Sequence, residues 1–527
     1  MQGQKAPPEP QLFVYGDPYA RLPRSPFYEA LKKHLDLEWV RQATEGLYAD
    51  GVGRPSLDPV VFVKLMLVAY FENIVTDSEL ELRAADSLTV RRFLGYALEE
   101  ETPERTTILK TRQRWPIEVF EAIFARVLEQ LAEHGLVKGK HLGTDTLLVD
   151  ANASMKSLRH RELGCSYWEF VKALYSQDGQ TPPLSEIAAK DTARPQKASN
   201  QDWVSATDPE AAVAVHRDGH TALSYRLDAT VDLETGVMVQ VGVQPGDVRD
   251  SVDLTERVEE AKATLEDVGI APQTLTADRG HHSEENVVEV EAQGISPIIR
   301  QQTGRRKTGV PAEAFTYLPG SDEYLCPAGQ PLRRLSHAPR EGWVRYQARG
   351  KVCRACPHFG VCTKSKSGRM LQRSVHQEAA HRNRERVRSD EGRALLAKHR
   401  HRAEVPWAYA KAYGGLGRIS TRGLTNATKK ALVQGIGWNV MKLVAHLTGL
   451  TPRGLPDRRL AGWSPLRDVS VGAFGRLCHL LRACAHIAHL LRLSALAAVR
   501  GRRGLRAQWA LSDLPDSNAR ACLSRAC

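Results

Sequence analysis

The sequence lacks any apolar run long enough to cross a lipid bilayer. Its longest such run, PVVFVKLMLVAYF at 59–71, contains Lys64 and falls short of the roughly 20 residues that a membrane helix needs. The opening residues, MQGQKAPPEPQLF, also contain no apolar core of the kind that marks a secretory signal peptide. We therefore expect no membrane partner and a cytoplasmic location.

Aromatic residues are scarce: they make up 6% of the 527 residues, whereas hydrophobic residues make up 42% and charged residues 25%. This composition is that of a globular chain, and its length is sufficient for two or more domains. Lys and Arg number 73 against 61 Asp and Glu, which gives a formal net charge of +12. That balance favours a polyanionic partner, although charge alone is weak evidence.

Cysteines are few and unevenly placed, because four of the nine lie between 326 and 362. A Cys-x2-Cys pair (Cys353 and Cys356) with further thiols at Cys326 and Cys362 suits tetrahedral zinc, although the long gap before Cys353 weakens the match. Free or redox-active thiols are the alternative, and the pattern leaves both open. Any zinc here would be structural, because the protein would supply all four ligands.

The N-terminal region at residues 26–135 has a helical pattern. Asp58 and Pro59 supply an N-cap and a first-turn proline before the apolar run, and Thr76 with Glu79 forms a capping-box signature.

A further helix is predicted from about residue 106 through ILKTRQRW, and it carries the basic residues Lys110, Arg112 and Arg114. Basic residues on the last helices of such a domain favour docking on DNA. A plain helical bundle with a solvated basic face explains the same spacing, so both interpretations stay open.

After residue 140 the apolar period changes from that of helices to that of strands. Strands are predicted at 141–150, 221–232, 236–243, 273–278 and 296–300, and helices at 250–268 and 283–293. This order indicates a mixed α/β sheet. The segment 176–215 has the composition of a loop excursion.

Three carboxylates are candidates for one site. Asp145 lies inside the predicted strand 141–150, Asp278 ends a second apolar strand, and Glu404 lies in a basic helix. A buried carboxylate must be hydrated, paired or bound to a metal, and for Asp145 alone a salt bridge is the simpler explanation. Carboxylates on two strands and a helix also suit two divalent cations that activate phosphodiester chemistry. Spacing alone does not decide between these alternatives.

The surroundings of these acids resemble a known family. GRPSLDPVVFVKLMLVAYFENIVTDSELELRAADSLTVRRFLGY (53–96) resembles the N-terminal helical domain of bacterial insertion-sequence transposases of the DDE class. TDTLLVDANAS looks like the first catalytic strand of those enzymes, and TADRGHHSEEN is similar to their second aspartate block. The resemblance makes Asp145 and Asp278 catalytic. His281 departs from it, because a tyrosine is usual there, and metal binding is expected to survive the change.

The third acid lies in the pattern Ala397-x2-Arg400-x3-Glu404-x6-Lys411, which resembles the Tyr-x2-Arg-x3-Glu-x6-Lys signature of one large group of these transposases. Three of the four positions match, and alanine at 397 puts one substrate contact in doubt. Arg400 and Lys411 would grip phosphates beside the scissile bond. The later GLGRISTRGLTNATKKALVQGIGWNVMKLVAHL resembles the closing helices, so the matches cover roughly 26–448.

The resemblance implies an α/β fold, namely an RNase H-like mixed sheet flanked by helices, preceded by an all-α domain and interrupted by a Cys-rich insertion. It implies that Asp145, Asp278 and Glu404 hold two Mg²⁺ ions, for which Mn²⁺ can substitute. It further implies DNA partners (terminal inverted repeats and target DNA), homo-oligomeric synapsis, strand cleavage and strand transfer. The location implied is the bacterial cytoplasm, with nucleoid association when the protein is bound to DNA. Two alternatives are a catalytically silent transposase-derived DNA-binding protein and a metal-dependent nuclease without joining activity.

Other aspartates of the sheet region are expected elsewhere. Asp150 is five residues from Asp145, so on a regular strand the two face opposite sides, and we expect Asp150 to cap or pair at the strand end. The remaining ones are expected at the surface or in turns (Asp228 and Asp232) and as caps of the following helix (Asp247 and Asp250).

The predicted organisation divides the chain into six parts. They are an extended segment (1–25), a helical DNA-binding domain (26–135), the first part of the catalytic core (136–300), the Cys-rich insertion (301–372), the C-terminal helices of the core (373–450) and a basic extension (451–527). Basic stretches at 373–402 and 497–506 are candidate DNA tracks.

Overall fold

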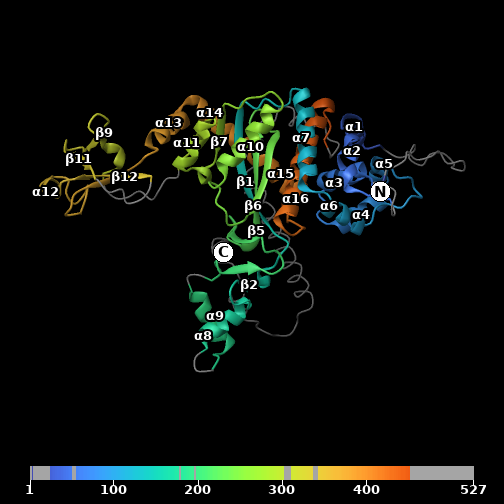
Figure 1. The fold of residues 1–527 in the computed structure, drawn as a ribbon, viewed down its shortest axis with the longest axis horizontal. Coiled ribbons are helices and arrows are strands. Elements are labelled where there is room, and N and C mark those ends of the chain that lie inside the picture. The colour runs from blue at the N-terminus through green and yellow to red at the C-terminus, as the bar shows by residue number, and fades with distance from the viewer. Residues whose placement is uncertain are drawn as a thin grey trace, which may run out of the picture. The chain divides into compact units, whose positions relative to one another are not determined.

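The computed structural model describes residue 3 and residues 24–49, 55–176, 180–194, 197–301, 310–335 and 342–451. Nearly all of the predicted extended segment 1–25, and the predicted basic extension from 452 onward with its run at 497–506, lie outside the described residues. Figure 1 traces the chain and labels its elements.

The N-terminal region is helical, as predicted. Asp58 accepts a hydrogen bond from the Val60 backbone amide at 2.8 Å and caps the central helix α3, whose residues are buried on almost every side. The Thr76–Glu79 capping box is also present. The helices of this region are α1 (Pro26–His34), α2 (Trp39–Thr44), α3 (Pro59–Phe71), α4 (Asp77–Asp86), α5 (Leu88–Leu94), α6 (Arg105–Arg114) and α7 (Ile117–Glu133).

A mixed sheet follows, and its strand order confirms the predicted RNase H-like arrangement. Along the sheet the order is β6-β5-β1-β7-β8, with β4 on the same side of β5 as β6. The first three strands are antiparallel, whereas β1, β7 and β8 are parallel. The strands are β1 (His141–Asp150), β4 (Ala212–Val215), β5 (Thr221–Asp232), β6 (Met238–Pro245), β7 (Thr274–Ala277) and β8 (Ser296–Ile299).

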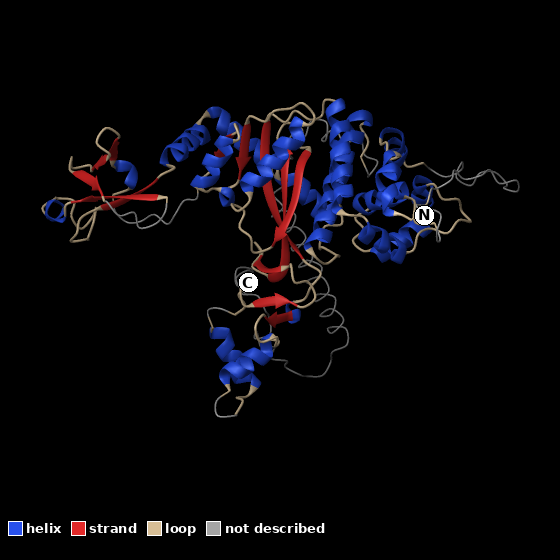
Figure 2. Cartoon of the chain, viewed as in Figure 1, coloured by secondary structure: helices blue, strands red, loops and turns tan. Residues whose placement is uncertain are grey.

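Helices cover both faces of this sheet (Figure 2). Of these helices, α10 packs on β5 and β6, α16 packs on β6, and α11 and α13 pack on β8, while α14 and α15 contact β1. The last helix, α16, is buried along most of its length and contacts β6, α7 and α3. The helices are α10 (Leu254–Glu266), α11 (Glu284–Ala292), α13 (Gln377–Arg388), α14 (Asp390–Arg402), α15 (Glu404–Tyr413) and α16 (Leu424–Thr448).

Two buried asparagines form hydrogen bonds with the backbone of the two outer strands, β6 and β8. Asn439 of α16 accepts a hydrogen bond from the Met238 amide at 2.9 Å and donates one to the Met238 carbonyl at 2.8 Å. Asn383 of α13 makes the same pair with the amide and carbonyl of Ile299, at 3.0 and 2.8 Å. A primary amide carries one donor and one acceptor side, so each residue mimics a missing strand.

Between β8 and α13 the chain forms a second, antiparallel sheet of order β13-β12-β11-β10-β9. Its small core is separate from the main one and consists of Phe315, Leu332, Tyr346, Ala348 and Leu371. The elements are β9 (Thr316–Leu318), β10 (Glu323–Leu325), β11 (Pro331–Arg334), β12 (Trp343–Ala348), α12 (Gly350–Arg354) and β13 (Met370–Ser374).

The segment 176–215 contains more structure than the predicted loop. Its aromatic anchor is Trp203, which packs edge-on against His160 and Phe170. Elements this short show little periodicity, which is why composition alone indicated a loop. Within the segment these elements are α9 (Leu184–Ala193), β3 (Trp203–Ser205) and the strand β4, and just before it the chain forms β2 (Leu158–His160) and α8 (Tyr167–Tyr175). Short 3₁₀ turns occur at Glu45–Leu47, Met155–Ser157, Arg279–His281 and Ala312–Ala314.

The prediction that Asp228 lies at the surface or in a turn is wrong, because it is 1% exposed and both faces of β5 are covered along most of its length. Asp232 is also fully buried, but it heads the turn after β5 and accepts hydrogen bonds from the Glu234 amide and the Thr235 hydroxyl, as the turn prediction requires. Asp228 pairs with Arg226 and Arg257, and Asp232 accepts a backbone hydrogen bond from Lys138.

Within the described residues, no helix combines the length and the apolar content that a bilayer crossing requires.

Candidate active site

Asp145 and Asp278 lie at matching positions on neighbouring parallel strands. β1 and β7 pair from His141 opposite Thr274 to Thr144 opposite Ala277, so the next residue in each case is an aspartate, Asp145 within β1 and Asp278 directly after β7. Carboxyl ends of parallel strands meet at one edge of a sheet, which is where open α/β sheets place their sites. The sheet register therefore brings the two predicted catalytic aspartates together.

The Asp145 side chain is buried, with 8% of the residue exposed. Its pKa is raised to about 6, mainly by burial and also by repulsion from Glu404 and Asp278, while a backbone hydrogen bond from Thr146 opposes the rise. In the described part of the chain no basic side chain forms an ion pair with Asp145. A buried carboxylate among other carboxylates favours a bound cation. The predicted alternative of a simple salt bridge has no partner here.

Asp278 is held in a different environment. Its Oδ1 accepts a hydrogen bond from the Gly280 amide at 2.9 Å and contacts Nδ1 of His281 at 2.7 Å. The hydrogen bond from His281 lowers the pKa of Asp278 to about 2, so this carboxylate is ionised. His281 is fully buried, and its Nε2 has no hydrogen-bond partner. The residue that departs from the family pattern therefore orients a predicted metal ligand.

Glu404 begins α15 and is exposed. The helix predicted across this region is split at Ala403, because Pro406 lacks the amide that would bond to the Arg402 carbonyl. Glu404 and Lys411 are two turns apart on α15, and both are exposed, whereas Trp407 between them is buried. One open face of α15 therefore carries the third predicted acid and a predicted phosphate contact.

Asp250 belongs to the site, and the prediction that it caps the following helix is wrong. The N-cap of α10 is Asp253. Asp250 accepts a hydrogen bond from the Thr146 hydroxyl at 2.9 Å, and it offers a ligand atom within 4.8 Å of those of Asp278 and His281.

A buried network of two arginines and two aspartates fixes the loop that carries Asp250. Arg226 donates to the Val248 carbonyl at 2.8 Å, and Arg257 donates to the Asp250 carbonyl at 2.9 Å. Asp228 contacts both arginines, at 3.1 and 2.8 Å, and Asp253 contacts Arg226 at 3.1 Å. Charges that are buried in balanced pairs hold a geometry that an unpaired charge would disrupt.

The donor set fits a hard divalent cation. Mg²⁺ takes oxygen ligands and keeps several waters, so a few carboxylates suffice, and the exposed Glu404 leaves room for water and substrate. Within the described residues, Asp145, Asp278 and Glu404 do not form a group of ligand atoms all within 4.8 Å. A pair of ions about 3.5–4 Å apart does not require that, because outer ligands then contact different ions.

The predicted DNA contacts have unequal environments. Arg400, Lys411, Lys110 and Arg114 are exposed, and Arg114 stacks over the ring of Tyr48 at 4.9 Å. Arg112 instead forms two hydrogen bonds to Asp77, at 2.6 and 2.8 Å, and only 16% of its side chain is exposed. Arg112 therefore links α6 to α4 through this ion pair.

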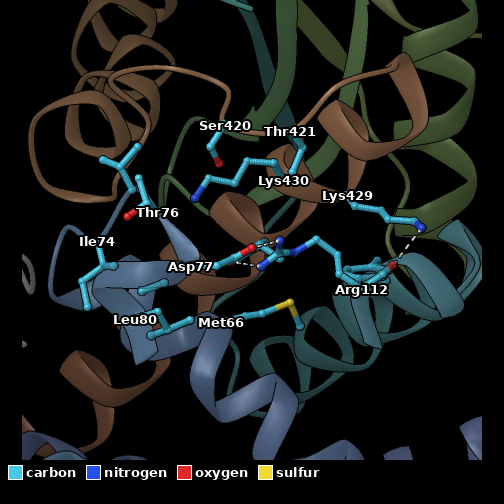
Figure 3. A pocket seen from close by; sticks show the side chains of 14 residues that line it. Met66, Ile74, Thr76, Asp77, Leu80, Arg112, Ser420, Thr421, Lys429 and Lys430 are labelled. Carbon is cyan, nitrogen blue, oxygen red and sulfur yellow. Dashed lines mark hydrogen bonds and ion pairs between the residues drawn. The ribbon is translucent and has the colours of Figure 1, made fainter. Parts of the chain in front are cut away.

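The Arg112–Asp77 pair lies in a small cleft between the N-terminal helices and α16 (Figure 3). Lys429 donates to the carbonyls of Arg112 and Trp115, at 3.2 and 2.6 Å. Lys430 extends into the cleft toward Ser420 and Thr76 (Figure 3). Burial and the charge of Arg112 lower its pKa to about 8.

The four predicted zinc ligands line one small pocket of the second sheet. The Gln330 amide donates to the Cys326 sulfur at 3.3 Å, and the Arg369 amide donates to the Cys353 sulfur at 3.4 Å. Such amide–sulfur bonds suit thiolates. Among the described residues, however, no three of these sulfurs lie within 4.8 Å of one another. The cysteines gather without forming a closed ligand set.

Two family models match the chain. One, described as a transposase domain (DUF772), covers residues 17–114, and the other, a transposase DDE domain, covers residues 325–444. No curated protein matches the sequence. Among solved structures, a piggyBac transposase synaptic complex with hairpin DNA is similar with a TM-score of 0.23 and 9% identity over 84% of each chain. A Mos1 transposase paired-end complex with the left transposon end gives 0.15 and 12%, over 49% of this chain and 65% of that one.

The two family matches cover the two ends of the described fold. The first contains the helices α1 to α6, and the second contains Arg400, Glu404 and Lys411. Both models describe transposase domains, and the central sheet between them brings Asp145 of β1 beside Asp278, which directly follows β7. The chain is therefore similar to transposases in both of these regions, and in the second to the DDE domain.

Proposed function

We propose that this chain is a transposase that binds the terminal inverted repeats of its element and catalyses metal-dependent strand cleavage and strand transfer into target DNA. The observation that carries the proposal is the Asp145 carboxylate, buried beside Asp278 and without an ion-pair partner among the described residues. A buried acid in this state favours a cation, and the exposed face of α15 leaves the site open to a substrate as large as DNA.

Asp145, Asp278 and Glu404 hold the metal ions in this proposal. Bound Mg²⁺ supplies Lewis-acid activation of the attacking water or 3′-hydroxyl and stabilises the leaving oxygen. Asp278 is ionised at neutral pH, because His281 and the Gly280 amide stabilise its charge. Asp145, with a pKa of about 6, is ionised more readily once a cation is present. Asp250 contributes a fourth carboxylate at the same strand ends.

Exposed basic side chains position the DNA. Arg400 and Lys411 flank Glu404 and contact phosphates beside the scissile bond, whereas Lys110 and Arg114 contact phosphates of the terminal repeat. Phosphate contacts set register and orientation without reading sequence. A homo-oligomer pairs two such ends in a synaptic complex.

The test is cleavage and joining with Mg²⁺ on DNA fragments that carry the ends flanking the gene in its native locus. We expect the wild-type chain to nick and join, and Asp145→Asn, Asp278→Asn and Glu404→Gln to bind the ends without cutting them. Asp267→Asn is the matched control, because Asp267 is exposed at the end of α10.

Two outcomes would replace the proposal. Wild-type protein that binds the ends but never nicks them indicates a catalytically silent DNA-binding protein. Nicking without joined products indicates a nuclease. Equal activity of Asp145→Asn and the wild type would remove the carboxylate from the mechanism.

We also propose a structural Zn²⁺ at Cys326, Cys353, Cys356 and Cys362, reached by closure of the pocket around the ion. The test is zinc content per chain after purification under reducing conditions. A Cys353→Ser variant should lose one equivalent. Equal zinc in variant and wild type would leave free thiols as the explanation.

A further inference from the structure

A second cluster of metal-ligating side chains lies away from the carboxylates of the active site. Asp150, His216 and His220 offer three ligand atoms that all lie within 4.8 Å of one another. Nε2 of His216 and Nε2 of His220 are each 3.2 Å from the same Oδ1 of Asp150. The proposed transposition chemistry uses none of these side chains.

The sheet register explains why they meet. Asp150 is opposite Ser224, Ser224 is opposite Ala212, and Ala214 is opposite Ala222. Directly opposed residues share a face, and alternate residues along a strand return to that face, so all of these side chains lie on one side of the sheet. The small alanines leave space above the sheet, into which longer neighbours can lean.

The two histidines close the hairpin between β4 and β5. The His216 amide donates to the His220 carbonyl at 2.9 Å, and Gly219 takes the left-handed conformation, with φ of 88°, that such a turn needs. The turn therefore fixes the two imidazoles as a cross-strand pair, and their rings stack with centroids 4.0 Å apart. The backbone of the turn therefore sets the relative position of the two imidazole rings.

The surroundings orient the ligands. Oδ1 of Asp218 lies 2.6 Å from Nδ1 of His220, which directs the other ring nitrogen of His220 toward Asp150. A carboxylate on the far nitrogen is the usual second partner of a metal-binding histidine. Nε2 of His216, the nitrogen that faces Asp150, also contacts the Ser224 hydroxyl at 2.8 Å, and that hydroxyl donates to the Ala222 carbonyl.

We propose that Asp150, His216 and His220 form a binding site for a divalent transition cation, with Zn²⁺ as the preferred ion. Two imidazoles and one carboxylate match the ligand preferences of zinc and disfavour Mg²⁺, which selects oxygen. Ligands about 2.0–2.1 Å from a tetrahedral ion are about 3.3 Å apart, close to the 3.2 Å separations seen here. Water or the Ser224 hydroxyl occupies the fourth position.

The bound ion would tie the β4–β5 turn to the end of the strand that carries Asp145. Asp150 is the last residue of β1, and its carbonyl also accepts a hydrogen bond from the Ile419 amide at 2.9 Å. The site therefore stabilises the end of the catalytic strand. This role does not depend on whether the protein joins DNA.

The test measures Co²⁺ and Zn²⁺ binding to the full chain, because Co²⁺ reports its ligands by colour. We expect the double variant His216→Ala/His220→Ala to lose one equivalent of either ion and the corresponding ligand-field absorption. The near-ultraviolet thiolate charge-transfer band of the cysteine pocket should be unchanged. Because only cysteine ligands give that band, it distinguishes metal in the cysteine pocket from metal at Asp150, His216 and His220. Added Mg²⁺ should not displace Zn²⁺ or Co²⁺ from the histidine site.

Graded variants exclude a trivial loss of folding. Asp218→Asn should weaken Zn²⁺ binding by roughly 10- to 100-fold, as removal of an outer partner does, and the loss of either histidine should weaken it more. Asp150→Asn keeps a hydrogen-bond acceptor for both imidazoles but should still lose affinity. His134→Ala, at an exposed helix end, is the matched control. Equal metal content in the wild type and the double histidine variant would overturn the proposal and leave a hydrogen-bonded cluster.

Discussion

The buried ring of His281 contacts the Asp278 carboxylate through Nδ1 at 2.7 Å, and this contact stands where the family pattern has a tyrosine. We expect His281→Ala to weaken Mg²⁺ or Mn²⁺ binding by roughly 10- to 100-fold, because an orienting partner of a ligand is lost. Metal titration of DNA nicking measures the effect.

The conservative variant His281→Asn supplies the control for that prediction. Its amide nitrogen lies close to the position of Nδ1 and can donate to the same Asp278 oxygen, so a large part of the affinity should return. If Ala and Asn at 281 weaken metal binding equally, the ring is needed for packing and not for its hydrogen bond.

Asp145 makes the metal-free protein less stable as the pH rises. Its pKa is about 6 in the folded chain against an ordinary 3.8, so between these values the native state binds more protons than the unfolded one. Stability from this group is therefore full below about pH 4 and falls until about pH 6, by at most about 3 kcal/mol. Asp145→Asn should consequently be inactive yet more stable at pH 7.5.

Denaturant unfolding in chelator at pH 4 and pH 7.5 checks this sign. The gap between Asp145→Asn and the wild type should open only at the higher pH, and the exposed Asp267→Asn should show none. Added Mg²⁺ should close the gap by stabilising the wild type alone. A gap that is the same at both pH values would contradict the assigned cause.

Lys110 and Arg112 are two residues apart on α6 but should respond differently to substitution. Lys110 is exposed, so Lys110→Ala should weaken DNA binding and reduce the salt-dependence slope by about 1, with stability unchanged. Arg112 is clamped to Asp77, so Arg112→Ala should lower the free energy of unfolding and leave the slope unaltered. If both variants reduce the salt-dependence slope of DNA binding equally, Arg112 also contacts DNA.

Lys430 should destabilise the fold at neutral pH. Its pKa is lowered from 10.5 to about 8 by burial and by Arg112, so the unfolded chain binds more protons between those values. Stability then rises as the pH increases from about 8 to about 10. Lys430→Met should be more stable than the wild type at pH 7, and thermal unfolding should show the difference shrinking toward pH 10. A constant difference would point to packing instead.

Sequence patterns predicted the elements better than the contacts between them. The bounds of β1 and β5 match the predicted strands, and the caps at Asp58 and Thr76 are present, because those signals are local. Asp228 was misplaced because β5 is covered on both faces, which removes the alternation that distinguishes core from surface.

In the candidate site, too, single residues were predicted better than the contacts between them. The resemblance identified Asp145, Asp278 and Glu404, but it gave no reason to join Asp250 to them. Only the long-range network of Arg226 and Arg257 brings that loop to the strand ends. Likewise, the meeting of Asp150 with His216 and His220 depends on the register of three strands, which no single stretch of sequence encodes.

The asparagines that close the sheet have a consequence for synthesis of the protein. Asn383 and Asn439 belong to helices that leave the ribosome long after β6 and β8. Until they arrive, a nascent chain keeps open strand edges and has no Glu404. The late C-terminal helices therefore supply both the caps of the sheet edges and the third predicted acid, so a chain that stops before them has neither a closed sheet nor Glu404.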